Sequence, residues 1–512
     1  MAEFDDLMAG IRAQPHDELR RLVFADWLDE NAHANPVYGP WAGYIRWAVA
    51  AVRTPRTDPD YWAYRRYPEP QPDGVAKLLG VEGLPGHFEW LCGFPDILGV
   101  DVDTLQEHDR RFANLSGPIR RLVVRARYHP GPPPPQPPDL PPWAERPPLP
   151  PVPTDWVAGA TVARAGSLEI GLQDPDAVAI LSALANRPVG ALPPLTLRIG
   201  MADPVVADAF ARLLLPSLVG LEVYGLQDPE DLARSPNLHG VKSFSLGGVP
   251  GDTGQDTALL SRMPNLTRLS LGDAHPLFLT ALAGGSSPLL TTLECPPADA
   301  GTPGWSAFVA SPAFERLSRL TWRRSHLDTS DAVSPADAPE PDAGELILNV
   351  AHLGPLRSVA LFASPLLHRC ECLFVENCAV TPEAYVALAA NPSARNLKVL
   401  SIQMPFKSEP FARGEPVAAL CRSPHFAGLT ELSLTFHDLT DDDFEELLSA
   451  TFAGGLRYLN LAGSYFSERL LERLTDPAVL PALTWLDIHA PTGGSRRLEP
   501  ALRTRFGPHF AF

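Results

Sequence analysis

Cysteine is scarce in this sequence, with six residues among 512. That number is too small for a scaffold held together by disulfides. The sequence also has no run of eighteen apolar residues, so no transmembrane helix is predicted. Its first twenty residues are acidic and lack the apolar stretch of a secretory signal. We therefore expect a cytoplasmic protein with no membrane partner.

Basic residues are in the minority as well. The chain has 42 Lys and Arg against 60 Asp and Glu, which gives a formal net charge of −18. Nucleic acids and anionic membranes bind basic surfaces, so neither is expected as a general partner, although a local basic patch remains open. Serine-hydrolase, P-loop, zinc-protease and dinucleotide-binding signatures are missing from the sequence. We predict neither a catalytic set of residues nor a cofactor.

What the sequence does contain is a recurring phrase in which leucine is followed by two residues, leucine, one residue and leucine. Its last three copies start 27 residues apart, and a fixed period of this size indicates a solenoid with one strand and one helix per repeat. The clear copies are LTRLSL (266–271), LKVLSI (397–402), LTELSL (429–434), LRYLNL (456–461) and LTWLDI (483–488).

Weaker copies extend this array toward the N-terminus. Near residue 360 two phrases compete, starting at Leu356 and Cys370, and we favour Cys370 because the next copy starts 27 residues later. The other weak copies start at Leu192, Leu218, Val241, Leu290 and Leu317, with two earlier candidates at Ile119 and Ala165.

Alternation along each short strand sends the leucines into a core between sheet and helices. The residues between the leucines then point to the concave side. Helix starts are expected at Thr381-Pro382, at Thr440 with Asp443, and at Ser467. The pattern resembles the ribonuclease-inhibitor-like class of leucine-rich repeat. This resemblance implies an α/β solenoid with a parallel sheet on the concave side and helices on the convex side.

The expected organisation has three parts. Residues 1–118 form an N-terminal helical cap, residues 119–495 the solenoid, and residues 496–512 a C-terminal cap. Two insertions interrupt the solenoid: a proline-rich segment at 130–153, with 14 prolines in 24 residues, and an acidic segment at 328–345. Neither has the apolar content to join a core, and whether either is functional is left open.

The N-terminal part carries a second resemblance. The stretch RLVFADWLDE (21–30), followed by Ile45-Arg46, is similar to the repeat-companion domain of planctomycete-type bacterial proteins. The similarity continues through WLCGF (90–94) and PIRRLVV (118–124), while Gly43-Tyr44 departs from the pattern. In that family the domain precedes leucine-rich repeats, and the resemblance implies no biochemical activity.

Several polar clusters have both a functional and a structural interpretation. Asp26 and Arg46 are predicted to be structural rather than a binding pair: either they form an ion pair that ties two helices, or Asp26 caps a neighbouring helix. Cys370, Cys372 and Cys378 lack the spacing of a zinc site, and the repeat pattern predicts that Cys370 and Cys378 are small buried residues. The run 441–443 of three aspartates is expected at a helix N-terminus, so no metal is predicted.

The favoured function is a non-enzymatic scaffold that binds a protein partner on its concave face. We expect Tyr458 and Trp485 to be neighbouring exposed rings, because exposed aromatic residues are typical of interface hot spots. The alternative is a protein-modifying enzyme or effector that uses the repeats as a substrate-recognition arm and 1–118, which contains one cysteine, Cys92, as the active part. The predicted partner-binding residues are Tyr458, Trp485, Asn460, Asp487, His489, Glu431, Phe374, Arg319 and Arg323.

Overall fold

The structure is a computed structural model of the chain. The chain divides into two compact units, one made of Met1–Ala50 and Glu69–Thr267 and the other of Ala51–Pro68 and Arg268–Phe512. The proline-rich insertion 130–153 and the acidic insertion 328–345 lie outside the described residues. The residues described are 2–14, 17–53, 74–91, 94–115, 118–125, 154–172, 177–201, 203–226, 229–247, 256–272, 276–295, 304–322, 346–351, 355–378, 380–404, 415–437, 439–464, 466–488, 497–506 and 510–511.

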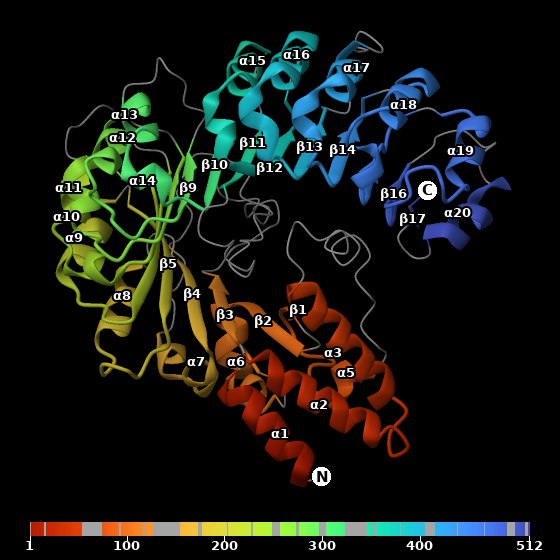
Figure 1. Ribbon diagram of the computed structural model, residues 1–512. Coiled ribbons are helices and arrows are strands. Elements are labelled where there is room, and N and C mark those ends of the chain that lie inside the picture. The colour runs from red at the N-terminus through yellow and green to blue at the C-terminus, as the bar shows by residue number, and fades with distance from the viewer. Residues whose placement is uncertain are drawn as a thin grey trace, which may run out of the picture. The chain divides into compact units, whose positions relative to one another are not determined.

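The first unit begins with helices and continues as a parallel sheet (Figure 1). Strand β1 pairs antiparallel with β2, and from β2 to β7 each strand is parallel to the next. Two strands thus lie in the segment expected to be a helical cap. Its strands are β1 (His87–Leu91), β2 (Phe94–Asp101), β3 (Arg121–Arg125), β4 (Ser167–Leu172), β5 (Leu195–Gly200), β6 (Leu218–Tyr224) and β7 (Ser243–Gly247). Its helices are α1 (Ala2–Ala13), α2 (Glu18–Glu30), α3 (Tyr38–Arg53), α5 (Val75–Leu78), α6 (Val102–Ala113), η1 (Asp155–Ala158), α7 (Ala160–Arg164), α8 (Ala177–Ala185), α9 (Pro204–Arg212), α10 (Pro229–Ala233), η2 (Pro236–Gly240) and α11 (Asp256–Ser261).

Aromatic side chains join the N-terminal helices to this sheet. Phe24 of α2 lies edge-on to Trp41 of α3, with ring centroids 5.2 Å apart, and Phe94 of β2 lies within 6 Å of both rings. Arg46 of α3 forms ion pairs with Asp26 at 2.7 Å and with Asp29 at 2.5 Å. The predicted helix-to-helix ion pair is therefore confirmed. Its partners are largely exposed, so it contributes no more than ~1 kcal/mol.

The second unit consists of repeats, each with a strand and a helical return. From β8 to β17 each strand is parallel to the next. In Figure 1 helices α15 to α18 lie on one side of strands β11 to β14. The strands are β8 (Arg268–Leu271), β9 (Thr292–Cys295), β10 (Arg319–Trp322), β11 (Leu346–Ala351), β12 (Cys370–Glu376), β13 (Val399–Gln403), β14 (Glu431–Thr435), β15 (Tyr458–Asn460), β16 (Trp485–Asp487) and β17 (Phe510–Ala511). The helices are α12 (Pro276–Ala283), α13 (Trp305–Val309), α14 (Pro312–Glu315), α15 (Pro355–Phe362), η3 (Pro365–Arg369), α16 (Pro382–Ala390), η4 (Pro392–Asn396), α17 (Glu415–Arg422), η5 (Pro424–Phe426), α18 (Asp441–Leu448), η6 (Ala453–Gly455), α19 (Glu468–Leu474) and α20 (Glu499–Phe506).

The leucines of successive repeats form buried rows. Leu432 pairs with Leu459, and Leu459 pairs with Leu486, across three adjacent parallel strands. The leucines of the repeated pattern in the copies 429–434 and 456–461 are each at most 1% exposed. These rows confirm the expected α/β leucine-rich-repeat solenoid.

Helix starts follow the expected capping chemistry. Thr440 and Asp443 form a capping box, in which the backbone N–H of Thr440 donates to the Asp443 carboxylate at 2.8 Å. The Ser467 hydroxyl accepts from the backbone N–H of Leu470 at 3.3 Å at the start of α19. Each cap satisfies a backbone group that the helix leaves without an intrahelical partner.

The structure decides between the two competing repeat copies that start at Leu356 and Cys370, and it contains one strand that the sequence analysis did not predict. The preference for Cys370 is confirmed, since β12 begins there, while the segment from Pro355 to Phe362 is helix α15. The unpredicted strand is β11, which pairs with β10 and β12. It follows directly on the acidic segment 328–345, whose length breaks the spacing by which the other repeats were found.

The C-terminal residues add to the end of the array. β17 pairs in parallel with β16. Arg505 of α20 binds the segment between α19 and β16. The Arg505 guanidinium donates hydrogen bonds to the carbonyl oxygens of Leu474, Asp476, Val479 and Leu480, at 2.5 to 3.0 Å. Carbonyl groups at the end of α19 thereby gain donors.

Leu459→Ala should lower the free energy of unfolding by about 2–5 kcal/mol, because the substitution leaves a cavity in a fully buried row. The measurement is urea unfolding followed by circular dichroism. The matched control in the same unit is Leu289→Ala, since Leu289 is 51% exposed, and this change should stay within about 0.5 kcal/mol. Equal effects of the two substitutions would contradict the placement of Leu459 in a buried row of leucines.

Candidate functional site

We use the term concave face for the strand residues that point away from the helices. In the second unit two rows of such residues cross strands β12 to β16, and a third row crosses strands β12 to β14. Row one is Cys372, Val399, Glu431, Tyr458 and Trp485; row two is Phe374, Ser401, Ser433, Asn460 and Asp487; row three is Glu376, Gln403 and Thr435.

Tyr458 and Trp485 are neighbours, as predicted. Their rings are stacked, with centroids 4.4 Å apart and planes inclined by 14°. The expectation that they are exposed is wrong, because Tyr458 is 3% and Trp485 is 1% exposed. Alternation along a strand determines the direction of a side chain but not how closely its neighbours cover it, and stacking removes a large area of both rings from water.

The polar residues around this pair are buried too. Glu431, Asn460 and Asp487, which were predicted to bind a partner, are each no more than 1% exposed. Asn460 is held on both sides, since its side-chain N–H donates to the Tyr458 hydroxyl at 3.4 Å and its carbonyl accepts from the Ala462 backbone N–H at 3.0 Å. The stacked rings and these two hydrogen bonds hold Tyr458, Trp485 and Asn460 in place on the concave face.

The other predicted site residues lie in different surroundings. Phe374 is buried in an apolar cluster with Ile347, Cys372 and Val399. Arg319 lies on β10 and is half-buried, on a strand separate from the three rows. The predicted residues His489 and Arg323 lie outside the described residues.

A cavity of about 130 Å³ lies across four strands of the concave face. Its origin can be traced to row two, where the small residues Ser401 and Ser433 occupy the two central strands between Phe374 and Asn460. The lining residues are Phe374, Glu376, Val399, Leu400, Ser401, Gln403, Glu431, Ser433, Thr435, Tyr458 and Asn460.

The lining of the cavity is acidic and partly aromatic. It contains the carboxylates of Glu376 and Glu431 and two aromatic rings, and its lining residues include no Lys, Arg or His. Glu376 is exposed at one end, whereas Glu431 is buried beside Tyr458. The hydroxyl groups of Ser433 and Thr435, which also line the cavity, lie 3.2 Å apart.

The concave face of the first unit holds an ion-pair ladder that the sequence analysis missed. Arg198 of β5 contacts Glu169 of β4 at 3.0 Å and Glu222 of β6 at 2.8 Å. The Tyr224 hydroxyl donates to Glu222, and burial together with this bond raises the pKa of Tyr224. These charged residues each stand between two buried apolar residues of a repeat, which is the signal that could have revealed them.

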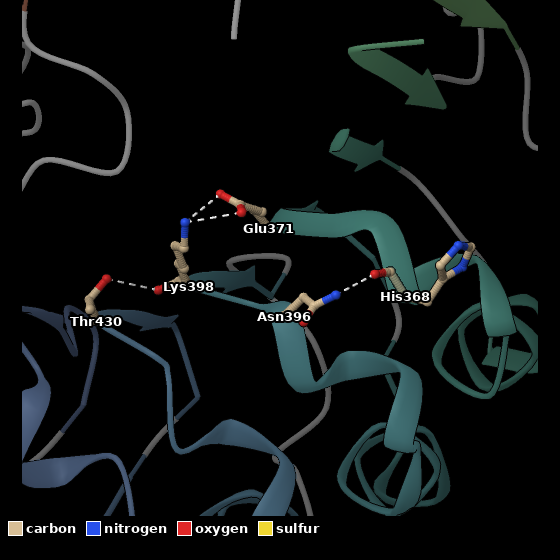
Figure 2. A network of polar contacts seen from close by, with 5 residues as sticks. All are labelled: His368, Glu371, Asn396, Lys398 and Thr430. Atoms are coloured by element: carbon tan, nitrogen blue, oxygen red, sulfur yellow. Dashed lines mark hydrogen bonds and ion pairs between the residues drawn. The ribbon is translucent and has the colours of Figure 1, made fainter. Parts of the chain in front are cut away.

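A polar network at the starts of strands β12 to β14 is structural (Figure 2). Lys398 binds both carboxylate oxygens of Glu371, at 3.0 and 2.9 Å. The Lys398 carbonyl accepts from the backbone N–H and the hydroxyl of Thr430, and the Asn396 amide donates to the carbonyl of His368 at 2.6 Å. This network connects one repeat to the next.

The cysteines near His368 are buried, as predicted. Burial raises the pKa of Cys370, and its thiol donates to the carbonyl of Cys372 at 3.1 Å. Cys378 donates to the carbonyl of Glu376 at 3.3 Å. Among the residues that the structure describes, no group of three His, Cys, Asp or Glu side chains is placed to hold a metal ion.

Cys92, the one cysteine of the segment 1–118 to which the alternative enzyme hypothesis assigned activity, lies outside the described residues. In the same segment, the His108 side chain lies 3.7 Å from the Glu107 carboxylate. Within the described part of the chain, no helix has the length and apolar character needed to cross a bilayer.

Comparison with known proteins gives structural likenesses only. No family model matches the chain, and no curated protein matches its sequence at a significant level. One similar solved structure is an internalin (inlF) from Listeria monocytogenes, with a TM-score of 0.31 and 14% identity over 63% of this chain and 78% of that chain. Another is the leucine-rich-repeat ectodomain of the receptor kinase GASSHO1/SCHENGEN3 from Arabidopsis thaliana, with a TM-score of 0.27 and 13% identity over 72% of this chain and 35% of that chain.

A buried histidine fixes the end of the strand that carries Thr435. The Tyr385 hydroxyl donates to Nε2 of His437, and Nδ1–H of His437 donates to the Thr435 carbonyl at 3.1 Å. Both contacts suit a neutral imidazole, and burial lowers the pKa of His437 to about 4.

The unfolded chain should therefore take up a proton at His437 near pH 6.5, whereas the folded chain does so only near pH 4. The contribution of His437 to the free energy of unfolding is fully present above pH 6.5 and falls by ~3 kcal/mol as the pH drops to 4. Urea midpoints between pH 7 and 4 measure this loss. His437→Gln should flatten the profile, while the exposed control His368→Gln should keep the wild-type slope. An unchanged slope in His437→Gln would contradict the assignment.

Proposed function

We propose that this protein is a non-enzymatic, cytoplasmic scaffold that binds a protein partner on the concave face of its second unit. The supporting observation is the cavity that crosses β12 to β15, with the exposed side chain of Glu376 and the half-buried side chains of Gln403 and Thr435 around it. Repeat proteins use such extended sheet faces for binding.

The aromatic pair has a different role in this proposal from the one first expected. Trp485 stacks behind Tyr458, and Tyr458 is a lining residue of the cavity. A rigid ring held in this way loses little conformational freedom when a partner binds. We therefore assign Tyr458 to the wall of the binding site and Trp485 to its support.

The remaining parts of the chain are assigned by the sequence resemblances. We propose that 1–118 is a repeat-companion cap, that 119–495 is a solenoid of the ribonuclease-inhibitor-like class, and that 496–512 closes its end. The terminal repeats of a solenoid need such caps, because their outer faces would otherwise expose the core.

Partner capture tests the proposal. The full chain, carrying an affinity tag, is incubated with lysate of its native cell, and bound proteins are quantified by mass spectrometry. Replacing two residues of row three, Glu376→Arg with Gln403→Arg, should reduce the bound partner at least tenfold, because bulky cations then occupy the rim. The thermal melt should change little, since both positions are accessible.

The matched control is Val386→Arg, at a 56% exposed position of α16 on the helical side of the same repeat. Capture by this control should equal that of the wild type. Loss of capture in the control, or full capture by the double variant, would rule out the concave face as the binding surface.

A further inference from the structure

We propose that His437 is a positioning residue of the partner site: its neutral imidazole latches the end of β14 to helix α16 through Tyr385, and protonation of the ring releases this end. The inference rests on the proposed function and adds a means of regulating the same surface. We use the term rim for row three of the concave face, which borders the cavity and consists of Glu376, Gln403 and Thr435.

His437 and Cys378 occupy equivalent positions in their repeats. Each stands eight positions after the start of its copy of the pattern, and these copies start at 429 and 370. The Cys378 thiol donates to the carbonyl of Glu376 at 3.3 Å, and Nδ1–H of His437 donates to the carbonyl of Thr435 at 3.1 Å. In both repeats a side chain therefore holds the rim residue two positions before it. The imidazole differs from the thiol in having a second nitrogen.

The second nitrogen connects the rim to a helix. Nε2 of His437 contacts the hydroxyl of Tyr385, a wholly buried residue of α16, and the two rings lie edge to face with centroids 5.9 Å apart. A carbonyl oxygen only accepts, so Nδ1 carries the proton toward Thr435 and the neutral ring accepts from Tyr385 at Nε2. One imidazole in one tautomer thus joins α16 to the end of β14.

The contact at Thr435 extends to the neighbouring strand. The Thr435 carbonyl also accepts from the backbone N–H of Met404 at 3.1 Å, and Met404 directly follows Gln403 of the rim. Between Thr435 and His437 the chain turns at Phe436, whose backbone is left-handed with a φ of 62°. A bulky residue keeps such a backbone only where its surroundings hold it. The latch therefore positions two of the three rim residues.

Protonation breaks the connection to the helix. Both nitrogens of an imidazolium donate, so Nε2 no longer accepts from Tyr385, and a positive charge is then enclosed in a buried site. The titratable side chain that the ring contacts is this phenol, and burial raises the pKa of Tyr385, so it stays the donor. Burial lowers the pKa of His437 to about 4, and no charged side chain among the described residues contributes to that shift. A falling pH thus favours an open rim, in which water reaches the ring.

The experiment is hydrogen exchange of the full chain, followed by mass spectrometry of its peptides. At pH 7, Tyr385→Phe should speed the exchange of rim peptides that contain Met404 or Phe436 at least tenfold, because their end of the sheet opens locally. Peptides from the first unit should exchange as in the wild type. The matched control is Tyr224→Phe, which removes a phenol hydroxyl that donates to Glu222 in the first unit and should leave the rim unchanged.

The pH profile separates a latch from a residue that only fills space. After correction for intrinsic exchange rates, opening of the wild-type rim should increase about twentyfold from pH 7 to pH 5, because the ring titrates near pH 6.5 when open and near pH 4 when closed. His437→Gln, whose amide can make both contacts without titrating, should keep the rim protected at pH 7 and remove this dependence. Partner capture by Tyr385→Phe should fall at least threefold at pH 7.

Unchanged rim exchange in Tyr385→Phe, or a pH dependence that His437→Gln retains, would overturn the latch. Wild-type capture by Tyr385→Phe, with capture still dependent on Glu376 and Gln403, would show that the latch does not position the partner site, while the proposed function stands. Capture that is independent of Glu376 and Gln403 would remove the proposed function, and the exchange measurements would then decide the latch by themselves.

Discussion

In-register pairing of the equivalent strands of successive repeats is the constraint on which this fold depends. Leu432, Leu459 and Leu486 form one row only because each repeat meets the next without a shift. A shift of one residue would turn every leucine of a strand to the concave face and every concave residue into the core. The same register that builds the core therefore also builds the three concave rows, and the core and the binding surface cannot vary independently.

Side chains that bind backbone carbonyl groups maintain this register between repeats. At the strand starts, hydroxyl groups of Thr267, Thr430 and Thr484 donate to a carbonyl of the preceding repeat that the backbone N–H also contacts. On the return segments, Arg369 and Arg505 donate to carbonyl groups at helix ends. Such carbonyl groups lack intrahelical donors, so each contact stabilises the junction at which one repeat follows another.

The sequence was sufficient for the register and insufficient for the accessibility of the site. A 27-residue period places Tyr458 beside Trp485, and the rings are indeed stacked. Their burial could not be predicted, since it depends on the volumes of side chains that other strands and segments bring together. Strand β11 was missed for a related reason, because the insertion 328–345 interrupts the period just before it. The cavity was also missed, although the serines at 401 and 433 that create it occupy equivalent positions in successive repeats.

The two units use the same concave positions in opposite ways. In the first unit, Arg198 neutralises Glu169 and Glu222 on either side of it, so that face supplies its own cation. In the second unit, the equivalent positions carry Ser401 and Ser433, and the acids that line the resulting cavity have no basic residue among the other lining residues. The same row therefore carries a network of charged side chains in the first unit and small hydroxyl side chains, which leave room for a cavity, in the second.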